Sequence, residues 1–370
     1  YQKRFIPAGQ TDNSLFYLNL KPTIHTDSRG GIHQENPVRK QGFRLCFAED
    51  DLYTAWFGDQ RRTDIEQVFF GRIDDNGRKA VDFFAGYEHL VSGWNGDMFN
   101  DMALYMSTQK LRTPKGLGWL ATKLGTSDQN TILNAMLHYQ QLYGSLWAES
   151  IWQIADASQS DTKFIISDHP ITLYNRFLGP RNKTWCRGFN DPDVAMHATH
   201  TIFPLSLDKV LIMTNLSWVR NPYQSGIAYR PNPHPLRPAM FNFQSIQTMR
   251  MLSEQEVREI NFVIKSRAHQ YVAAAKEEWL YPEQFVSKSG WNTYGDGLLL
   301  MPDPRSVEFT SEIIIGNHDG SATAFDEYGR RPWQQDYGAS DHSSEFSMHQ
   351  QFQGDFALKF GSERRGRALS

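Results

Sequence analysis

Residues 163–174 read KFIISDHPITLY, in which two short apolar runs flank the polar turn SDHP at 167–170. Apolar runs of this length, bounded by Ser, Asp and Pro, are typical of β-strands. Two further runs follow, HTIF at 200–203 and KVLIM at 209–213. Because strands that follow one another closely along the chain usually pair, these four predict a small antiparallel sheet.

Helical patterns surround this segment. Apolar residues recur every three to four positions over 64–85, 97–112 and 131–155, which is the spacing that gives a helix one apolar face. The DDNG sequence at 74–77 predicts a turn that divides the first pattern. A proline at 114 ends the second pattern, since the residue before a proline avoids helical backbone angles.

The clearest helix begins at a capping box, SEQE at 253–256, in which the Ser and Glu side chains each satisfy a backbone donor. We therefore expect an α+β fold over residues 1–282, with a helical bundle packed on the small antiparallel sheet and an irregular N-terminal arm. Residues 283–370 form a C-terminal extension that is partly strand. We expect poor order from about residue 340, because the end of the chain is rich in Ser, Gln and Gly.

Composition bounds the class of protein. The chain has 370 residues, a formal net charge of −3, an aromatic share of 13% and two cysteines, Cys46 and Cys186. Two cysteines without metal-binding spacing exclude a disulfide framework and favour a reducing, cytoplasmic compartment. No apolar run has the length that spans a bilayer, so we expect no membrane association. The small negative charge argues against bulk electrostatic capture of nucleic acid and leaves a local basic groove open.

The turn at 167–170 is the first candidate site. A strand that ends in Ser167-Asp168 delivers a carboxylate to the edge of rigid β-structure, where it can face a crevice. The structural alternative is that Asp168 hydrogen-bonds its own backbone and starts the turn. Taken alone, the motif favours this structural alternative, because short motifs of the kind are common.

Gln109 and Arg112 form the second candidate. They are three residues apart and share one helical face, where an amide and a guanidinium can together bind a carboxylate or a phosphate. The alternative for Arg112 is a cation favoured by the helix dipole. Glu66 is the third candidate, because its apolar neighbours could draw it into a pocket, whereas a solvated helix face is the commoner position for Glu.

His197 and His200 offer two imidazoles three residues apart. The residues that follow have the pattern of a strand, which turns the two rings to opposite faces and argues against a shared metal ion. The sequence contains no Gly-rich phosphate loop and no Gly-x-Ser-x-Gly elbow.

Short segments along the chain, taken in order, resemble the bacterial and fungal family called domain of unknown function 4238. They are YQKRF at 1–5, IE at 65–66, QxxRTP at 109–114, Trp152 before FIISDHP at 164–170, FPLS at 203–206, and Asn261 with RA at 267–268. The resemblance covers about residues 1–280 and implies no reaction. It implies that four polar residues share one site: Glu66, Gln109, Arg112 and Asp168.

Two departures from the family pattern matter for function. The family usually opens with a His-Tyr-Val-Pro-like stretch just before the first matching segment, and that stretch is missing here. The family also tends to have Asn where this chain has His169. A ligand contact at that position would therefore change from an amide to an imidazole.

Two hypotheses from different classes follow. The first is a metal-assisted hydrolase acting on phosphodiesters or nucleotides, such as a nuclease-like toxin or defence effector. Asp168 and Glu66 would hold Mg²⁺ or Mn²⁺, which prefer oxygen ligands, and His169 would move a proton. The groups that orient the phosphate would be Ser167, Gln109 and Arg112.

The second hypothesis is a non-catalytic binding or regulatory module for a small anion or a peptide. The aromatic-rich interior and Arg112 would form its pocket, and the C-terminal extension would contact a protein partner. The basis for this hypothesis is the lack of a strong catalytic signature.

Overall fold

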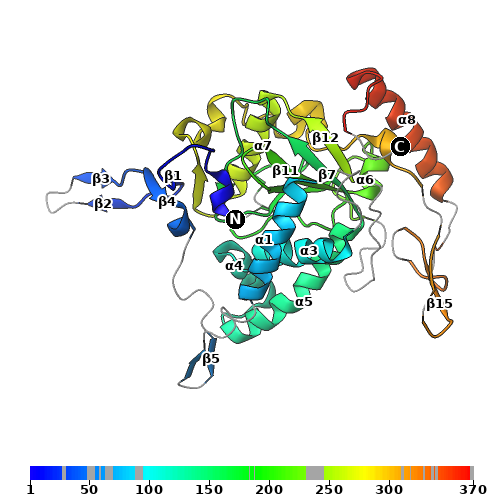
Figure 1. Cartoon of the computed structure of the whole chain (residues 1–370), viewed down its shortest axis with the longest axis horizontal. Helices are drawn as coiled ribbons and strands as arrows, with labels where there is room; N and C mark the ends of the chain where they lie inside the picture. The colour runs from blue at the N-terminus through cyan, green and yellow to red at the C-terminus, as the bar shows by residue number, and fades with distance from the viewer. Residues whose placement is uncertain are drawn as a thin grey trace.

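The structure is a computed structural model of the chain. It describes residues 1–26, 31–47, 55–57, 60–62, 70–87, 95–182, 184–186, 188–230, 246–309, 312–316, 318–327, 330–334, 337 and 341–366. The candidate site residue Glu66 lies outside the described residues, and so do the apolar residues that begin the first helical pattern. The described residues form an α+β fold, as predicted, with two main sheets (Figure 1).

The larger sheet has five strands in the order β12-β7-β11-β10-β9. Their bounds are Gln247–Met251 (β12), Ser150–Asp156 (β7), Lys209–Asn215 (β11), Thr199–Pro204 (β10) and Thr172–Asn175 (β9). All neighbours are antiparallel except β12 and β7, which are parallel. The predicted strands at 200–203 and 209–213 are confirmed as β10 and β11.

The smaller sheet has four antiparallel strands in the order β4-β1-β13-β8. Their bounds are Val38–Gly42 (β4), Ser14–Asn19 (β1), Tyr271–Ala274 (β13) and Ile166–Ser167 (β8). The prediction that the two runs of KFIISDHPITLY pair in one sheet is wrong. The first run supplies β8 of the smaller sheet and the second supplies β9 of the larger one, so residues 168–170 cross between the sheets.

The five-stranded sheet lies between two hydrophobic cores, because successive side chains of a strand point to opposite faces. Leu211 and Met213 of β11 join the core of the helical bundle. Val210 and Ile212 join the core that contains the smaller sheet. The bundle consists of four helices on one side of β7 and β11 (Figure 1): Gly71–Ala85 (α1), Gly96–Leu111 (α3), Pro114–Leu124 (α4) and Gln129–Ala148 (α5).

Helix α1 corrects the predicted turn at 74–77, because it continues through the DDNG sequence without a break. Gly77 is there for close packing, since a Cβ on this residue would lie 2.2 Å from Cδ2 of Tyr105 on α3. The predicted stop at Pro114 is confirmed. Thr113 caps α4 by accepting a hydrogen bond from the Gly116 backbone N at 3.1 Å, and the chain turns between α3 and α4.

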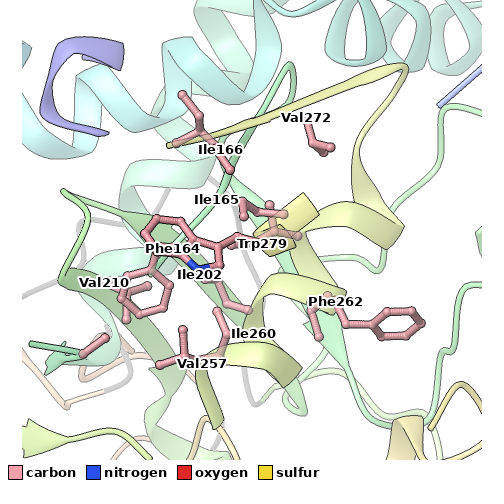
Figure 2. Close-up of a cluster of buried hydrophobic side chains, with 14 of the residues drawn as sticks. Phe164, Ile165, Ile166, Ile202, Val210, Val257, Ile260, Phe262, Val272 and Trp279 are labelled. Carbon is pink, nitrogen blue, oxygen red and sulfur yellow. The ribbon is translucent and has the colours of Figure 1, made fainter. Parts of the chain in front are cut away.

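The second core is built around helix α7, Glu254–Arg267, whose predicted capping box between Ser253 and Glu256 is confirmed. Val257 and Ile260 of this helix lie beside Phe164 and the strand residues Ile202 and Val210, as Figure 2 shows. The apolar run 164–166 belongs to this core, and the backbone N of Ile165 donates to Oδ1 of Asn261 on α7 at 3.2 Å, which fixes the start of the crossing at 168–170.

The C-terminal extension contains the hairpin of Ile313–Gly316 (β14) with Ala322–Phe325 (β15), which confirms the strand expected there. Where we expected poor order, the structure has helix α8 at Asp341–Phe360. It packs on the short helix Leu216–Arg220 (α6). Arg305 donates hydrogen bonds to the carbonyl oxygens of Gly361 and Glu363, both at 2.8 Å, so the residues after α8 are also held.

The remaining elements are short. Two further hairpins pair Ile24–Thr26 (β2) with Ile32–Gln34 (β3) and Ala55–Phe57 (β5) with Gln60–Arg62 (β6), and Figure 1 shows both projecting from the body of the chain. The 3₁₀ turns are Gln2–Phe5, Phe43–Leu45, Glu277–Leu280, Pro282–Gln284, Trp291–Gly297 and Pro304–Ser306. Among the described residues, no helix has the length and apolarity that crossing a membrane requires.

Candidate functional site

Asp168 is clamped to the backbone at the start of β13. Its Oδ1 accepts a hydrogen bond from the backbone N of His269 at 2.8 Å, and its Oδ2 accepts from Gln270 at 2.7 Å and Tyr271 at 2.9 Å. Burial raises the pKa of this carboxyl, and the three backbone N–H groups act against that shift. Both carboxylate oxygens are thus used to tie the crossing segment to the smaller sheet.

His169 occupies the next position and contacts the helical bundle. Its Nδ1 lies 2.7 Å from the hydroxyl of Thr113, and its Nε2 lies 2.7 Å from Nζ of Lys110. Only 1% of the residue is exposed. The crossing segment therefore sends one side chain to each of the two layers, Asp168 to the smaller sheet and His169 to the turn between α3 and α4.

Asp191 completes the cluster by bridging two lysines. Its Oδ2 lies 2.5 Å from Nζ of Lys110, and its Oδ1 lies 2.6 Å from Nζ of Lys115. Oδ2 is also 3.1 Å from Nε2 of His169. The three charged side chains are each 6% or 7% exposed. We call Lys110, Lys115, His169 and Asp191 the inner cluster.

Burial and neighbouring charges shift the pKa values of three members of the inner cluster, His169, Lys110 and Asp191. Burial lowers the pKa of His169 to about 3, and the charge of Lys110 adds to the shift, so the imidazole is neutral. Burial also lowers the pKa of Lys110 to about 8, against the attraction of Asp191. For Asp191, burial acts to raise the pKa, but Lys110 and Lys115 hold it well below its usual range.

The protonation state of Lys110 sets the direction of the hydrogen bonds in this cluster. As an ammonium, Lys110 donates to Nε2 of His169, to Asp191 and to the backbone carbonyl of Ile171 at 3.2 Å, which leaves the His169 Nδ1–H to donate to Thr113. As a neutral amine, Lys110 can accept at the same place while the Nε2–H of His169 donates to Asp191. Because the pKa of Lys110 lies above that of His169, the amine holds the proton and the imidazole stays neutral beside a fixed carboxylate.

The inner cluster lines a cavity of about 430 Å³ between α4, α5 and the loop before β10. The lining also includes six aromatic side chains: Trp119, Tyr139, Tyr143, Trp185, Phe189 and Tyr229. Trp185, Phe189 and Tyr229 are 37%, 38% and 49% exposed, so they lie towards solvent while the inner cluster is buried. We call these three residues the aromatic rim. A cavity of this volume with a few convergent polar groups is typical of a small-molecule site.

The predicted site residues divide between two places. Gln109 and Arg112 both reach Asp74 on α1. Arg112 donates to it through two nitrogens, at 2.9 and 2.7 Å, and Gln109 Nε2 lies 3.4 Å from its Oδ1. The prediction that they share one helical face is confirmed, and that face contacts α1. Ser167 Oγ accepts from the backbone N of His169 at 3.2 Å. Of the predicted site residues that the structure describes, His169 is the one that lines the cavity.

The sequence analysis missed the three charged residues of the inner cluster. Lys110 and Lys115 lie on either side of Arg112, which the sequence did suggest as a site residue. Lys110 lies near the end of α3, where most of the neighbouring residues are buried. Asp191 belongs to the segment DPD at 191–193, a pair of carboxylates two residues apart in a loop. That pair and the closely spaced lysines were available signals, but nothing local links positions so far apart in the chain.

Three other buried titratable residues, His197, His200 and Glu149, have partners outside the inner cluster. His200 Nδ1 lies 2.8 Å from the hydroxyl of Thr214, and the His197 ring stacks on Trp218 at 5.0 Å. Glu149 is buried and forms an ion pair with Arg230. Among the described residues, no three His, Cys, Asp or Glu side chains gather as metal ligands would. Cys46 and Cys186 are free thiols.

Residues 127–278 match the model of a family described as "Protein of unknown function (DUF4238)". The resemblance stated from the sequence motifs is confirmed over these residues. The match takes in His169 and Asp191 but begins after Lys110 and Lys115, so it is narrower than the predicted span of 1–280. No curated protein and no solved structure matches the chain.

Proposed function

We propose that the chain binds a small anionic ligand in the cavity between α4 and α5, with Lys115 as the main contact to the negative charge. The observation that supports this is the sharing of one carboxylate, Asp191, by two buried lysines. Two ammonium groups beside one carboxylate leave one positive charge that is not balanced inside the cluster. A buried excess charge is costly unless something of opposite sign lies near it.

The lining of the whole cavity also has more positive than negative side chains. Its lining contains three lysines, Lys110, Lys115 and Lys123, against two aspartates, Asp191 and Asp193. The low pKa of His169 keeps that ring uncharged. The net charge of the lining is therefore +1, and the wall of low polarity around it strengthens attraction for an anion.

Lys115 is the best placed of the three lysines to meet the ligand. Its ammonium group has three protons, and two are directed to Asp191 Oδ1 at 2.6 Å and to the carbonyl oxygen of Arg267 at 2.7 Å. The third proton remains for a ligand. Lys110, in contrast, already has three acceptors, so its role is to hold Asp191 and His169 in position.

The test is calorimetric titration of the protein with inorganic phosphate and with ribose 5-phosphate. Replacing Lys115 by Met keeps the length of the side chain and removes its charge, and we expect affinity to fall by about tenfold to a hundredfold, as for a lost hydrogen bond to a charged group. Lys265→Met is the matched control. Lys265 also donates to one carboxylate, Glu283, and one carbonyl oxygen, that of Leu280, but lies away from the cavity lining.

Binding that is as tight in Lys115→Met as in the native chain contradicts the proposal, and so does an equal loss in both lysine variants. Should Lys115→Met fail to fold, the exposed Lys123→Gln provides the second measurement. Lys123 lines the outer part of the cavity, and we expect a loss of about threefold that shrinks as salt is added, as for a screened surface charge.

Hydrolysis stays a prediction from the sequence, and the same samples test it. In that hypothesis His169 moves a proton, and its imidazole lies between Lys110 and Thr113. The assay is incubation with nucleotides, RNA and DNA, with and without Mg²⁺ or Mn²⁺. Turnover that requires His169 supports the hydrolase. Binding without turnover supports the binding module alone.

A further inference from the structure

We infer that the ligand of this cavity carries a planar ring next to its anionic group, and that the aromatic rim receives the ring. This inference rests on the function proposed above and narrows its ligand class. The chemistry it specifies is shared by nucleoside monophosphates and by aromatic carboxylic acids. The experiment below separates the two.

The first support is the division of the cavity into two chemically different parts. The inner cluster is charged and buried, with Lys115 and Asp191 each 7% exposed. The aromatic rim lies at the open end, with Trp185, Phe189 and Tyr229 between 37% and 49% exposed. A ligand that satisfies both parts has its charge at one end and a flat apolar surface at the other. An inorganic anion would leave the rim in water.

The second support is that the rim residue Phe189 is held in place before any ligand binds. A Cβ at Gly118 of α4 would lie 2.7 Å from two atoms of its ring, so the ring rests directly on the helix backbone. His269 stacks against the ring with a centroid distance of 5.5 Å and an angle of 26°. A ring fixed in this way can make an edge-to-face contact with a ligand ring without losing further rotamer freedom.

The third support comes from a second pair of aromatic side chains in the cavity lining. Trp119 on α4 and Tyr139 on α5 meet edge to face, with their centroids 5.2 Å apart and an interplanar angle of 81°. Both residues line the cavity. This contact joins α4 to α5 at the cavity, so the lining offers further ring surface beyond the aromatic rim. A ligand ring can gain from this surface through offset-stacked or edge-to-face contacts.

The experiment compares pairs of ligands that differ only in the ring. Adenosine 5′-monophosphate is titrated beside ribose 5-phosphate, and indole-3-propionate beside propionate. We expect the ring to tighten binding by about tenfold in at least one pair, as one stacked base does elsewhere. A gain in the first pair assigns the site to nucleotides, and a gain in the second alone assigns it to aromatic carboxylates.

Variants of the aromatic rim test whether its side chains cause the gain in affinity that the ligand ring brings. Phe189→Leu and Trp185→Leu should bring the affinity ratio within a pair close to one, while binding of the ring-free anion stays within about twofold of the native chain. The matched controls are Phe285→Leu and Trp333→Leu, at exposed aromatics that do not line this cavity. Gly118→Ala gives an independent test, because its methyl group needs the space of the Phe189 ring.

The inference is overturned if neither ring changes affinity by more than about twofold while ribose 5-phosphate still binds through Lys115. In that case the proposed anion-binding function stands. If no anion binds at all, the proposed function fails and this inference fails with it. Circular dichroism and a thermal melt of each variant show whether a loss of binding reflects a loss of folding.

Discussion

Asp168 and Tyr271 are joined by two hydrogen bonds that run in opposite directions. The backbone N of Asp168 donates to the carbonyl oxygen of Tyr271 at 3.1 Å, and the backbone N of Tyr271 donates to Oδ2 of Asp168 at 2.9 Å. The same carboxylate accepts from the two residues before Tyr271. The side chain of Asp168, which the sequence suggested for catalysis, thus ties the segment that crosses between the sheets to strand β13 of the smaller sheet.

The first prediction concerns the stability that Asp168 provides. Asp168→Ala leaves three backbone N–H groups without their charged acceptor, and we expect the free energy of unfolding to fall by about 3 kcal/mol or more. Asp168→Asn should lose about half as much, because its amide retains one oxygen acceptor. Urea unfolding measures both, with the exposed Asp161→Asn as control. An Asp168→Ala variant as stable as the control would contradict a stabilising role for the three hydrogen bonds that Asp168 accepts.

The second prediction concerns acid. Burial lowers the pKa of His169 to about 3, whereas an unfolded His titrates near pH 6.5. Between these values the unfolded chain binds the extra proton, so the stabilisation is complete above about pH 6.5 and is lost as the pH falls below it. From pH 7 to pH 5 the native chain should lose about 2 kcal/mol more than His169→Asn, which has no proton to bind.

Urea unfolding at the two pH values gives this difference directly. His200, whose pKa burial also lowers to about 3, contributes equally in both proteins and cancels in the comparison. Equal losses in the native chain and in His169→Asn would show that His169 is not held neutral. The variant replaces the imidazole by a smaller uncharged amide that can still form hydrogen bonds.

Features set by neighbouring residues could be predicted from the sequence. The capping box at Ser253, the end of α3 before Pro114 and the strands β10 and β11 all follow from local patterns of apolar residues, caps and breakers. The α+β class follows from these elements together. Each of these signals lies within a few residues of the element that it determines.

Features that join distant positions could not be predicted. Nothing near Asp168 indicates that it will accept hydrogen bonds from residues about one hundred positions later. Likewise, Asp191 meets Lys110 across 81 positions, and neither has a local pattern that names the other. The polar turn at 167–170 has the same local chemistry whether it joins two paired strands or crosses between two sheets. The choice is made by packing against α7 and β13.

The third prediction concerns Arg112, which the sequence suggested as a ligand contact. Its bidentate pair with Asp74 is partly exposed, with side chains 16% and 43% accessible. A double-mutant cycle with Arg112→Ala and Asp74→Ala should therefore give a coupling energy of about 0.5–1 kcal/mol, since solvent screens the pair. Affinity for ribose 5-phosphate should change by less than about twofold. A loss comparable with that of Lys115→Met would return Arg112 to the binding site.

The last prediction separates two helical glycines. Gly77→Ala places a methyl group 2.2 Å from the Tyr105 ring, which forces α1 and α3 apart, and we expect a loss of about 1–3 kcal/mol from overpacking. Gly144→Ala on α5 is the matched control, because a Cβ there meets nothing within 4 Å. It should stabilise the chain by about 0.5–1 kcal/mol, the usual advantage of Ala over Gly in a helix.

Thermal melts of both variants measure the difference. The double variant Gly77→Ala with Tyr105→Ala should lose less stability than the sum of the two single losses, because removing the Tyr105 ring removes the clash. Stabilisation by both single variants would mean that α1 and α3 do not pack at Gly77, and that the DDNG sequence has another role.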